Sequence, residues 1–384
     1  MKYVDLGQLV KIQKGSKLYE VLEKSVDTVR YIQIDDLRNS ENIKYATTGS
    51  KSVICNKNDI LIAWDGANAG TIGFGLEGAI GSTLAKLTPV KKYFTPYVGC
   101  FLQSRFKYLR GSCTGATIPH ISRSALTKTQ IPLPPYPEQQ RIAAILDKAD
   151  ALRQKNKQLL AAYDELMQVT FLDMFGDPVT NPKGWETRLL AECYISTKEG
   201  TKCGPFGSAL KKLEYTNSGI PVWTMDNIRP NKFVEGISLF ITEKKFDDLS
   251  GYRTKKNDII ISRAGTVGKM CVIPNGRKAI ISTNLIRLRL NLNKLQPIYF
   301  TTLMSFWGPK IARLKTGSDN SFTHMNTGIL NNIELPVPPI TLQNQFALIV
   351  KNIEAQKAIL KQSRQESEDL FNGLVQKAFN GELN

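Results

Sequence analysis

Two stretches of the sequence come close to catalytic motifs, and each lacks a residue that the chemistry requires. A methyltransferase that acts on an amino group holds that group with Asn or Asp before Pro-Pro-Tyr, but here Leu133 precedes Pro134-Pro135-Tyr136 and cannot accept a hydrogen bond. A phosphate-binding loop needs G-x-x-x-x-G-K-[ST]. Residues 265–270, GTVGKM, lack the first Gly at that spacing and place Met270 where Mg²⁺ needs a hydroxyl.

A metal-dependent nuclease is the catalytic alternative that stays open. Asp226 followed by Glu243 and Lys245 loosely fits an Asp and a later Glu-x-Lys, although chance supplies such patterns in a chain that is 22% charged. The only two histidines, His120 and His324, have no obvious nucleophile beside them. We therefore expect a chain that is not itself an enzyme.

The cysteines predict neither a zinc site nor a disulfide scaffold. No pair is spaced as C-x-x-C, and four clustered soft ligands would be needed for structural zinc. Free thiols fit a reducing cytoplasm, which is the predicted location. No apolar run approaches the ~20 residues that cross a bilayer, and the N-terminus lacks the apolar region of a secretory leader.

The charge favours a polyanionic partner. Lys plus Arg is 51 and Asp plus Glu is 34, a formal net charge of +17. Residues 1–180 hold 23 basic and 17 acidic residues and the remainder holds 28 and 17, so the excess is not confined to a tail. A positive field spread over both halves favours a nucleic acid, which the paired modules below specify as double-stranded DNA, and a thermophile-type or merely Lys-rich surface is the alternative.

The chain repeats itself. KNDILIA at 57–63 returns as KNDIIIS at 256–262, AGTIG at 69–73 as AGTVG at 264–268, and PLPP at 132–135 as PVPP at 336–339. Gln139 and Gln343 follow the proline clusters at equal spacing, and each histidine lies twelve residues before its cluster. The same order in both halves predicts two similar modules. Short β-type runs mixed with helical stretches predict an α+β (mixed α/β) fold for each.

A long polar segment with apolar heptads follows each module, at 138–176 and 341–384. An Asn in such a row fixes helix register at some cost in stability. Two such helices should pack on each other, and a pseudo-twofold repeat makes them antiparallel. The residues expected in the helix–helix seam are Ile142, Ile145, Ala149, Leu152, Asn156, Leu159 and Leu166, with Phe346, Ile349, Ile353, Leu360, Leu370 and Leu374.

The predicted organisation is a module at 1–137, a helix at 138–176, a module at 177–340 and a helix at 341–384. Two unrelated domains with independent arms are the alternative. Two modules held apart by helices could each bind a short DNA segment, and because their loops differ the site would be two-part and asymmetric. Basic residues in Gly- or Ser/Thr-rich connections are the candidate DNA contacts, although any one of them could be a solvated surface charge: Lys14, Lys17, Arg110, Arg123, Lys202, Lys211, Lys212, Arg263, Lys269, Arg277 and Lys315.

Three strings give the chain a family resemblance. IPLPPYPEQQRI at 131–142, MFGDP at 174–178 with NPKGWE at 181–186, and LVQKAFNGEL at 374–383 resemble the specificity (S) subunit of type I restriction-modification enzymes. Leu342 stands in the second proline cluster where the first has Glu138, a departure confined to the local helix cap.

The resemblance implies a non-catalytic subunit with two target recognition domains. It also implies methylation (M) subunits on the helices and restriction (R) subunits joining them. S-adenosylmethionine, ATP and Mg²⁺ would then belong to those partners, and no metal or cofactor is expected in this chain. A standalone two-module DNA-binding regulator is the alternative.

Overall fold

A computed structural model describes residues 2–21, 24–39, 41–115, 117–229, 232–236, 239–263, 268–307 and 325–383. The chain forms two compact units, one of Met1–Leu159 with Leu360–Asn384 and the other of Leu160–Ile359. Each unit therefore holds one globular module and part of both long helices, α4 (Tyr136–Phe175) and α9 (Ile340–Asn380). No helix in these ranges is long and apolar enough to span a membrane.

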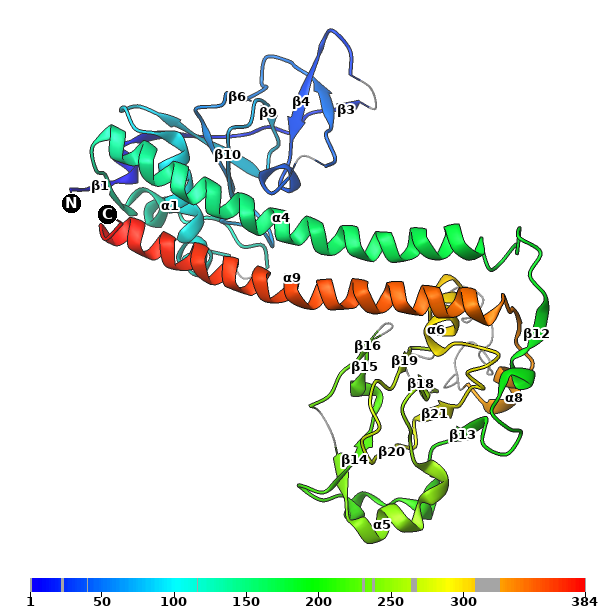
Figure 1. Cartoon of the computed structure of the whole chain (residues 1–384). Helices are drawn as coiled ribbons and strands as arrows, with labels where there is room; N and C mark the ends of the chain where they lie inside the picture. The colour runs from blue at the N-terminus through cyan, green and yellow to red at the C-terminus, as the bar shows by residue number, and fades with distance from the viewer. Residues whose placement is uncertain are drawn as a thin grey trace. The chain divides into compact units, whose positions relative to one another are not determined.

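The first module, whose strand β10 is labelled in Figure 1, is built on a four-stranded antiparallel sheet in the order β2-β10-β7-β8. The strands are β2 (Val10–Lys14), β7 (Ile60–Ala63), β8 (Ile72–Phe74) and β10 (Leu84–Pro89). All four side chains of β7 are buried, because alternate residues enter different hydrophobic clusters on the two faces of the sheet. Helix α1 (Thr95–Ser104) contacts β8 and adds Tyr97 and Phe101 to one cluster.

A five-stranded sheet completes this module in the order β3-β5-β4-β9-β6. Its strands are β3 (Glu20–Val21), β4 (Thr28–Ile32), β5 (Tyr45–Thr47), β6 (Ile54–Cys55) and β9 (Gly78–Ile80). Strands β4 and β9 pair in parallel, with Tyr31 opposite Ala79. The remaining elements are the pair β1 (Tyr3–Asp5) and β11 (Gln130–Pro132), with η1 (Leu6–Gln8), η2 (Asp35–Leu37), α2 (Phe106–Gly111) and α3 (Arg123–Thr127).

The second module repeats this plan, which confirms the internal repeat. Its four-stranded sheet runs β13-β21-β18-β19, and a three-stranded sheet runs β17-β14-β20 with a parallel pairing of β14 and β20. The main strands are β13 (Thr201–Cys203), β14 (Ile220–Trp223), β17 (Leu239–Ile241), β18 (Ile259–Ser262), β19 (Met270–Val272), β20 (Ile280–Ile281) and β21 (Leu285–Leu288). Two short pairs are β12 (Thr187–Leu189) with β22 (Glu334–Pro336) and β15 (Ile228–Arg229) with β16 (Lys232–Phe233).

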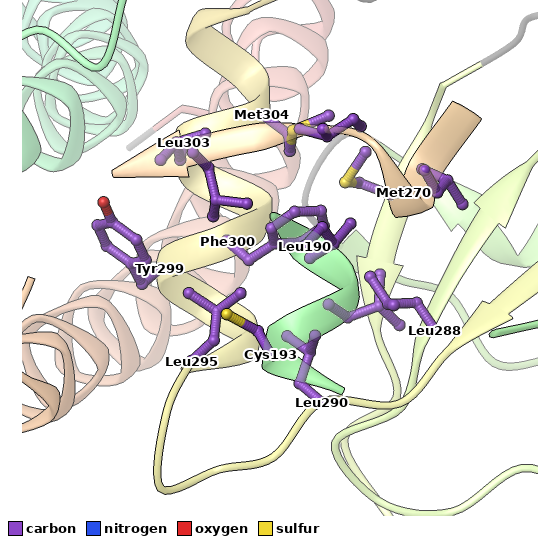
Figure 2. Close-up of a cluster of buried hydrophobic side chains, with 14 of the residues drawn as sticks. Leu190, Cys193, Met270, Leu288, Leu290, Leu295, Tyr299, Phe300, Leu303 and Met304 are labelled. Carbon is purple, nitrogen blue, oxygen red and sulfur yellow. The ribbon is translucent and has the colours of Figure 1, made fainter. Parts of the chain in front are cut away.

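The helices of the second module are short. They are η3 (Leu190–Cys193), η4 (Gly207–Ala209), η5 (Lys212–Glu214), η6 (Met225–Asn227), α5 (Glu243–Asp248), η7 (Ser250–Tyr252), α6 (Pro297–Phe306) and α8 (Thr327–Asn331). Figure 2 shows Phe300 and Leu303 of α6 lying beside Leu190 of η3, with Leu288 of β21 nearby. Each fully buried Leu or Phe stabilises the fold by about 1.5–3 kcal/mol, so this cluster holds the module together.

The matched prolines and glutamines join each long helix to its own module. Tyr97 donates its hydroxyl hydrogen to the Pro132 carbonyl at 2.8 Å, and Tyr299 does the same to Pro336 at 2.9 Å. The buried amide of Gln139 accepts from the Phe94 backbone N–H at 2.9 Å and donates to the Pro134 carbonyl at 2.8 Å. These contacts explain why prolines and a glutamine recur at equal spacing.

The Gln343 amide makes the same two kinds of bond in the second unit and a third besides. It accepts from the Gln296 N–H at 2.8 Å and donates to the Pro338 carbonyl at 2.7 Å. It also donates to the Lys294 carbonyl at 3.2 Å.

The long helices run antiparallel within each unit. In the first unit, Arg153 of α4 pairs with Glu368 at 2.8 Å, and Asn156 donates to Ser363 at 3.2 Å. In the second unit, Asp164 pairs with Lys357 at 2.7 Å, and further along α4 the Phe171 ring lies 5.5 Å from the Phe346 ring. In both units the contacts move backward along α9 as they move forward along α4.

Two rows of seam residues are expected on each helix. One row of each helix is buried or half-buried, and the other is largely exposed. Ile142, Ala149 and Asn156 are buried on α4, as Phe346 and Ile353 are on α9, while Leu360 and Leu374 are half-buried. The other predicted residues lie largely outside the seam: Ile145 is half-buried, and Leu152, Leu159, Leu166, Ile349 and Leu370 are exposed.

The positions one residue later along each helix are more buried. Arg153 of α4 contacts Phe371 of α9 across the seam, while Leu146 and Val350 are buried in the hydrophobic clusters of the first and second units. Residues three and four apart share a helix face, so Ile145 and Leu146 are both neighbours of Ile142. The spacing of apolar residues alone therefore cannot decide which of them lies nearer the partner helix. The Arg153 guanidinium occupies the seam because it pairs with Glu368 and lies 4.2 Å from the centroid of the Phe371 ring.

Candidate nucleic-acid interface

Several loops of the first module meet at one edge of its four-stranded sheet, where β2 and β7 end and β8 and β10 begin. The Gly15 N–H donates to the Leu84 carbonyl at 2.9 Å, and the Trp64 N–H donates to the Thr83 carbonyl at 2.7 Å. A Cβ on Gly15 would lie 2.3 Å from the Gly81 carbonyl oxygen, so only glycine permits this approach. The loops are thereby fixed by backbone contacts.

A turn that leads to His120 closes over the same edge. The His120 N–H donates to the Thr114 carbonyl at 2.7 Å, and the Ile121 N–H donates to the Trp64 carbonyl at 2.9 Å. Gly66 and Gly115 have φ values of 91° and 92°, in the left-handed region that glycine tolerates. The chain thus brings residues far apart in sequence onto one platform.

Basic side chains gather on this platform around one carboxylate. The Lys14 ammonium lies 2.6 Å from one oxygen of Asp65, and Nδ1 of His120 lies 2.6 Å from the other. Burial raises the pKa of Asp65, but hydrogen bonds from Lys14 and His120 outweigh it, so the pKa lies below its usual value. Arg110 donates to the Gly66 carbonyl at 3.0 Å, and Lys17 is exposed on the loop that follows β2.

Equivalent loops carry different side chains in the second module. Gly204 donates to the Leu285 carbonyl as Gly15 does to Leu84, and Arg263 takes the backbone place of Trp64, with its N–H on the Asn284 carbonyl at 3.0 Å. The Arg263 guanidinium lies 4.6 Å from the centroid of the Phe206 ring.

Four more predicted residues of this module are exposed. Lys269 immediately precedes β19, and its backbone N–H donates a hydrogen bond to Ser262 Oγ at the end of β18. Lys211 and Lys212 lie at η5, and the Lys202 ammonium lies 5.2 Å from the centroid of the Tyr252 ring.

Some predicted contacts lie elsewhere. Arg123 is on helix α3 and donates to the Ile12 carbonyl at 3.4 Å, away from the strand ends. Arg277 follows β19 and forms an ion pair with Glu235 at 2.6 Å. Lys315 and His324 lie outside the described residues.

Sequence reasoning missed residues of the platform that are not basic or not in Gly-rich loops. Arg38 follows η2 and donates to Asn68 at 2.7 Å, which places a further arginine beside the loop after β7. Asp65 gives no signal of this kind, because a pattern of phosphate contacts is a pattern of basic residues. Phe206 carries no charge and became visible only through its contact with Arg263.

The residues of the nuclease alternative do not form a metal centre. Glu243 is exposed at the start of α5, 3.8 Å from the Lys278 ammonium, and Asp226 accepts from Thr224 Oγ1 at 3.4 Å. Within the described part of the chain, no group of three or more His, Cys, Asp or Glu side chains could hold a metal ion. All six cysteines are free thiols.

A second candidate surface runs along the long helices. The leucines that do not enter the seam leave an exposed apolar row on α4, and α9 carries exposed apolar residues of its own. The row on α4 comprises Leu152, Leu159 and Leu166, which recur every seven residues, and the exposed residues on α9 are Leu348, Ile349, Ile359 and Leu370. Apolar residues gathered in this way indicate a protein-binding surface.

Comparison with known proteins gives one consistent result. A family model described as the type I restriction modification DNA specificity domain matches residues 1–162 and 182–368. The specificity subunit of the MjaVIII type I restriction enzyme of Methanocaldococcus jannaschii is 25% identical over 380 residues, covering 95% of this chain and 88% of the relative. The EcoBI specificity subunit of Escherichia coli is 19% identical over 387 residues, covering 93% and 80%.

Solved structures share the fold. The type I restriction-modification S subunit from M. genitalium superposes with a TM-score of 0.63 at 17% identity, covering 98% of this chain and 96% of that one. A structure described for complex assembly and conformational transition of a type I system gives a TM-score of 0.56 at 16% identity, covering 100% and 98%. The two modules and the two long helices are therefore features of a known architecture.

Proposed function

The chain belongs to the type I restriction-modification DNA specificity family, and from this premise we propose how its own residues serve that function. It is a specificity subunit that carries no catalytic role itself. Each module binds one part of a bipartite, asymmetric DNA site through the loops at the edge of its four-stranded sheet. Basic residues there neutralise phosphates and position the module, while a few polar side chains contact base edges.

One observation carries this proposal. The two modules share a backbone framework but carry different side chains at equivalent positions at the edge of the four-stranded sheet. Cys203 stands opposite Ile286 in the place where Lys14 stands opposite Ala85, and Arg263 stands in the place of Trp64. Similar backbone frameworks place the loops of the two modules in similar positions. Different side chains on those loops would bind different bases. Two different half-sites follow.

Methylation subunits are the proposed partners of the long helices. The apolar row of Leu152, Leu159 and Leu166 supplies the kind of surface that a permanent complex buries. Restriction subunits would join through them. S-adenosylmethionine, ATP and Mg²⁺ would then be bound by those partners, all within the cytoplasm.

Mapping methylated adenines in a cell that expresses this chain with its methylation subunit tests the function directly. We expect one motif with two defined parts separated by undefined bases. Methylation without such a motif would contradict the proposal. A chain that binds a DNA sequence but never co-purifies with a methylation subunit would instead be a standalone regulator.

A further inference from the structure

We propose that Asp65 is a positioning residue that aims Lys14 and His120 at DNA in the half-site bound by the first module. The inference rests on the proposed function and goes beyond it by assigning a role to one acidic side chain. Asp65 would not contact DNA itself. Its carboxylate would hold two DNA-contacting groups in one fixed arrangement before the DNA arrives.

The contacts around Asp65 engage both of its oxygens. Oδ2 lies 2.6 Å from the Lys14 ammonium and Oδ1 lies 2.6 Å from Nδ1 of His120. The Asp65 side chain is 15% exposed, while the side chains of Lys14 and His120 are 50% and 48% exposed. The acid is thus covered, and the two groups that it holds remain accessible.

The pairing also determines what His120 offers. Because an ionised carboxylate can only accept, Nδ1 of His120 carries the hydrogen and the opposite ring nitrogen, Nε2, stays available. Nε2 therefore faces outward, where it can form a hydrogen bond with a polar atom on a base edge. Lys14 has further N–H donors beyond the one on Asp65, and these suit guanine oxygen or phosphate.

The backbone on both sides of Asp65 is fixed. Gly66 donates its N–H to the Pro119 carbonyl at 2.9 Å, and Asp65 and His120 form an isolated β-bridge. Ordering two flexible side chains in advance reduces the loss of side-chain entropy that accompanies DNA binding. A preorganised pair therefore improves binding of the correct site.

Among the residues that the structure describes, the second module has no lysine at the position of Lys14. Cys203 stands at the equivalent place in the second module and has no ammonium to offer a carboxylate. A change at Asp65 should therefore affect one half of the site and leave the other half unchanged.

Charge and positioning predict opposite effects, which makes the role measurable. Asp65→Asn removes a negative charge from a basic surface, so sequence-independent attraction to phosphate should not weaken. The amide keeps one acceptor oxygen for two donors, so Lys14 or His120 is released. Binding of the correct half-site should fall although binding of unrelated DNA does not.

The experiment uses the complex assembled with its methylation subunits and a 30-base-pair duplex that carries the motif mapped for the wild type. For Asp65→Asn we expect Kd for the motif to rise about tenfold, the effect of losing one base contact. Kd for a scrambled duplex should not rise. Genome-wide mapping should show relaxed specificity in one half only.

Glu20→Gln is the matched control, because Glu20 pairs with Lys44 at 2.9 Å in the same module and the charge change is identical. It should leave both dissociation constants within about twofold. An equal rise on both duplexes with Asp65→Asn, or no change on either, overturns the inference, as does relaxation of both halves. A wild-type complex that maps to no motif contradicts the proposed function instead.

A double-mutant cycle separates positioning from direct contact. In a Lys14→Met/His120→Gln background, Asp65→Asn should add less than about twofold to Kd for the motif, because the groups that it positions are gone. A full tenfold effect in that background overturns the inference. Circular dichroism and retained discrimination in the other half show that each variant is folded.

Discussion

Replacing Gln139 with Met should destabilise the first unit by an amount that its hydrogen bonds determine. The substitution keeps an unbranched side chain of similar length but leaves the Phe94 N–H and the Pro134 carbonyl without their partner. Each buried polar group that loses its partner costs about 1–3 kcal/mol, so two of them cost about 2–6 kcal/mol. For a unit of this size, that lowers Tm by about 4–24 °C.

Gln343 gives an internal comparison because its amide makes three bonds. Gln343→Met leaves groups of Gln296, Pro338 and Lys294 without that partner, so its effect should exceed that of Gln139→Met by about 1 kcal/mol. Scanning calorimetry of the full chain measures both effects.

The exposed neighbours Gln140 and Gln345 are the controls, because the same substitution there should change stability by less than about 0.5 kcal/mol. A Gln139→Met variant that melts within about 2 °C of the wild type would refute the reasoning. The recurring glutamines would then be unrelated to the attachment of the helices.

Three further predictions concern the spacer, the interface and the thiols. Seven residues inserted in each long helix, after Leu159 and after Ile359, leave the contacts within each unit intact and add about 10 Å of helix. The undefined spacer in the methylated motif should change in length, and an unchanged spacer would contradict a helical ruler. Arg263→Ala should weaken binding of the motif about 5- to 150-fold in a filter-binding titration, whereas Arg277→Ala should change it by less than about threefold because Arg277 is occupied by Glu235. If the two substitutions weakened binding equally, the assignment of Arg263 and not Arg277 to the DNA interface would be contradicted. Burial raises the pKa of Cys55 to about 11 and the pKa of both Cys100 and Cys271 to about 12. Only the thiolate form reacts with iodoacetamide. Alkylation of these three cysteines at pH 8 should therefore be at least about a hundredfold slower in the folded than in the unfolded chain. Mass spectrometry that finds these cysteines labelled rapidly in folded protein would show that they are not buried.

The repeat and the helices could be predicted from sequence because they depend on periodic, local signals. The recurring KND segments become β7 and β18, and the proline clusters with their glutamines become the helix attachments. The row of Leu152, Leu159 and Leu166 misled the seam assignment because hydrophobicity alone favours leucine over arginine. Only the contacts of Arg153 with Glu368 and Phe371 explain why a charged residue lies in the seam.

The cluster at the candidate interface could be predicted only in part, because it depends on contacts between residues far apart in sequence. The charge of Lys14 makes it a candidate, but its partner Asp65 follows β7 and His120 lies 55 residues beyond Asp65. No local pattern joins three such residues. Arg277 shows the converse, since a basic residue in a polar loop satisfied the sequence criterion and is paired with Glu235.

The most direct test of the central claim is a module exchange followed by mapping of methylated adenines. Residues 1–137 would be replaced by the corresponding part of a related specificity subunit whose motif is known, and the chimera would be expressed with the same methylation subunit. The account predicts that one half of the motif changes to that of the donor while the other half and the spacer stay the same. A chimera that alters both halves, or neither, would contradict reading of the site by separate modules.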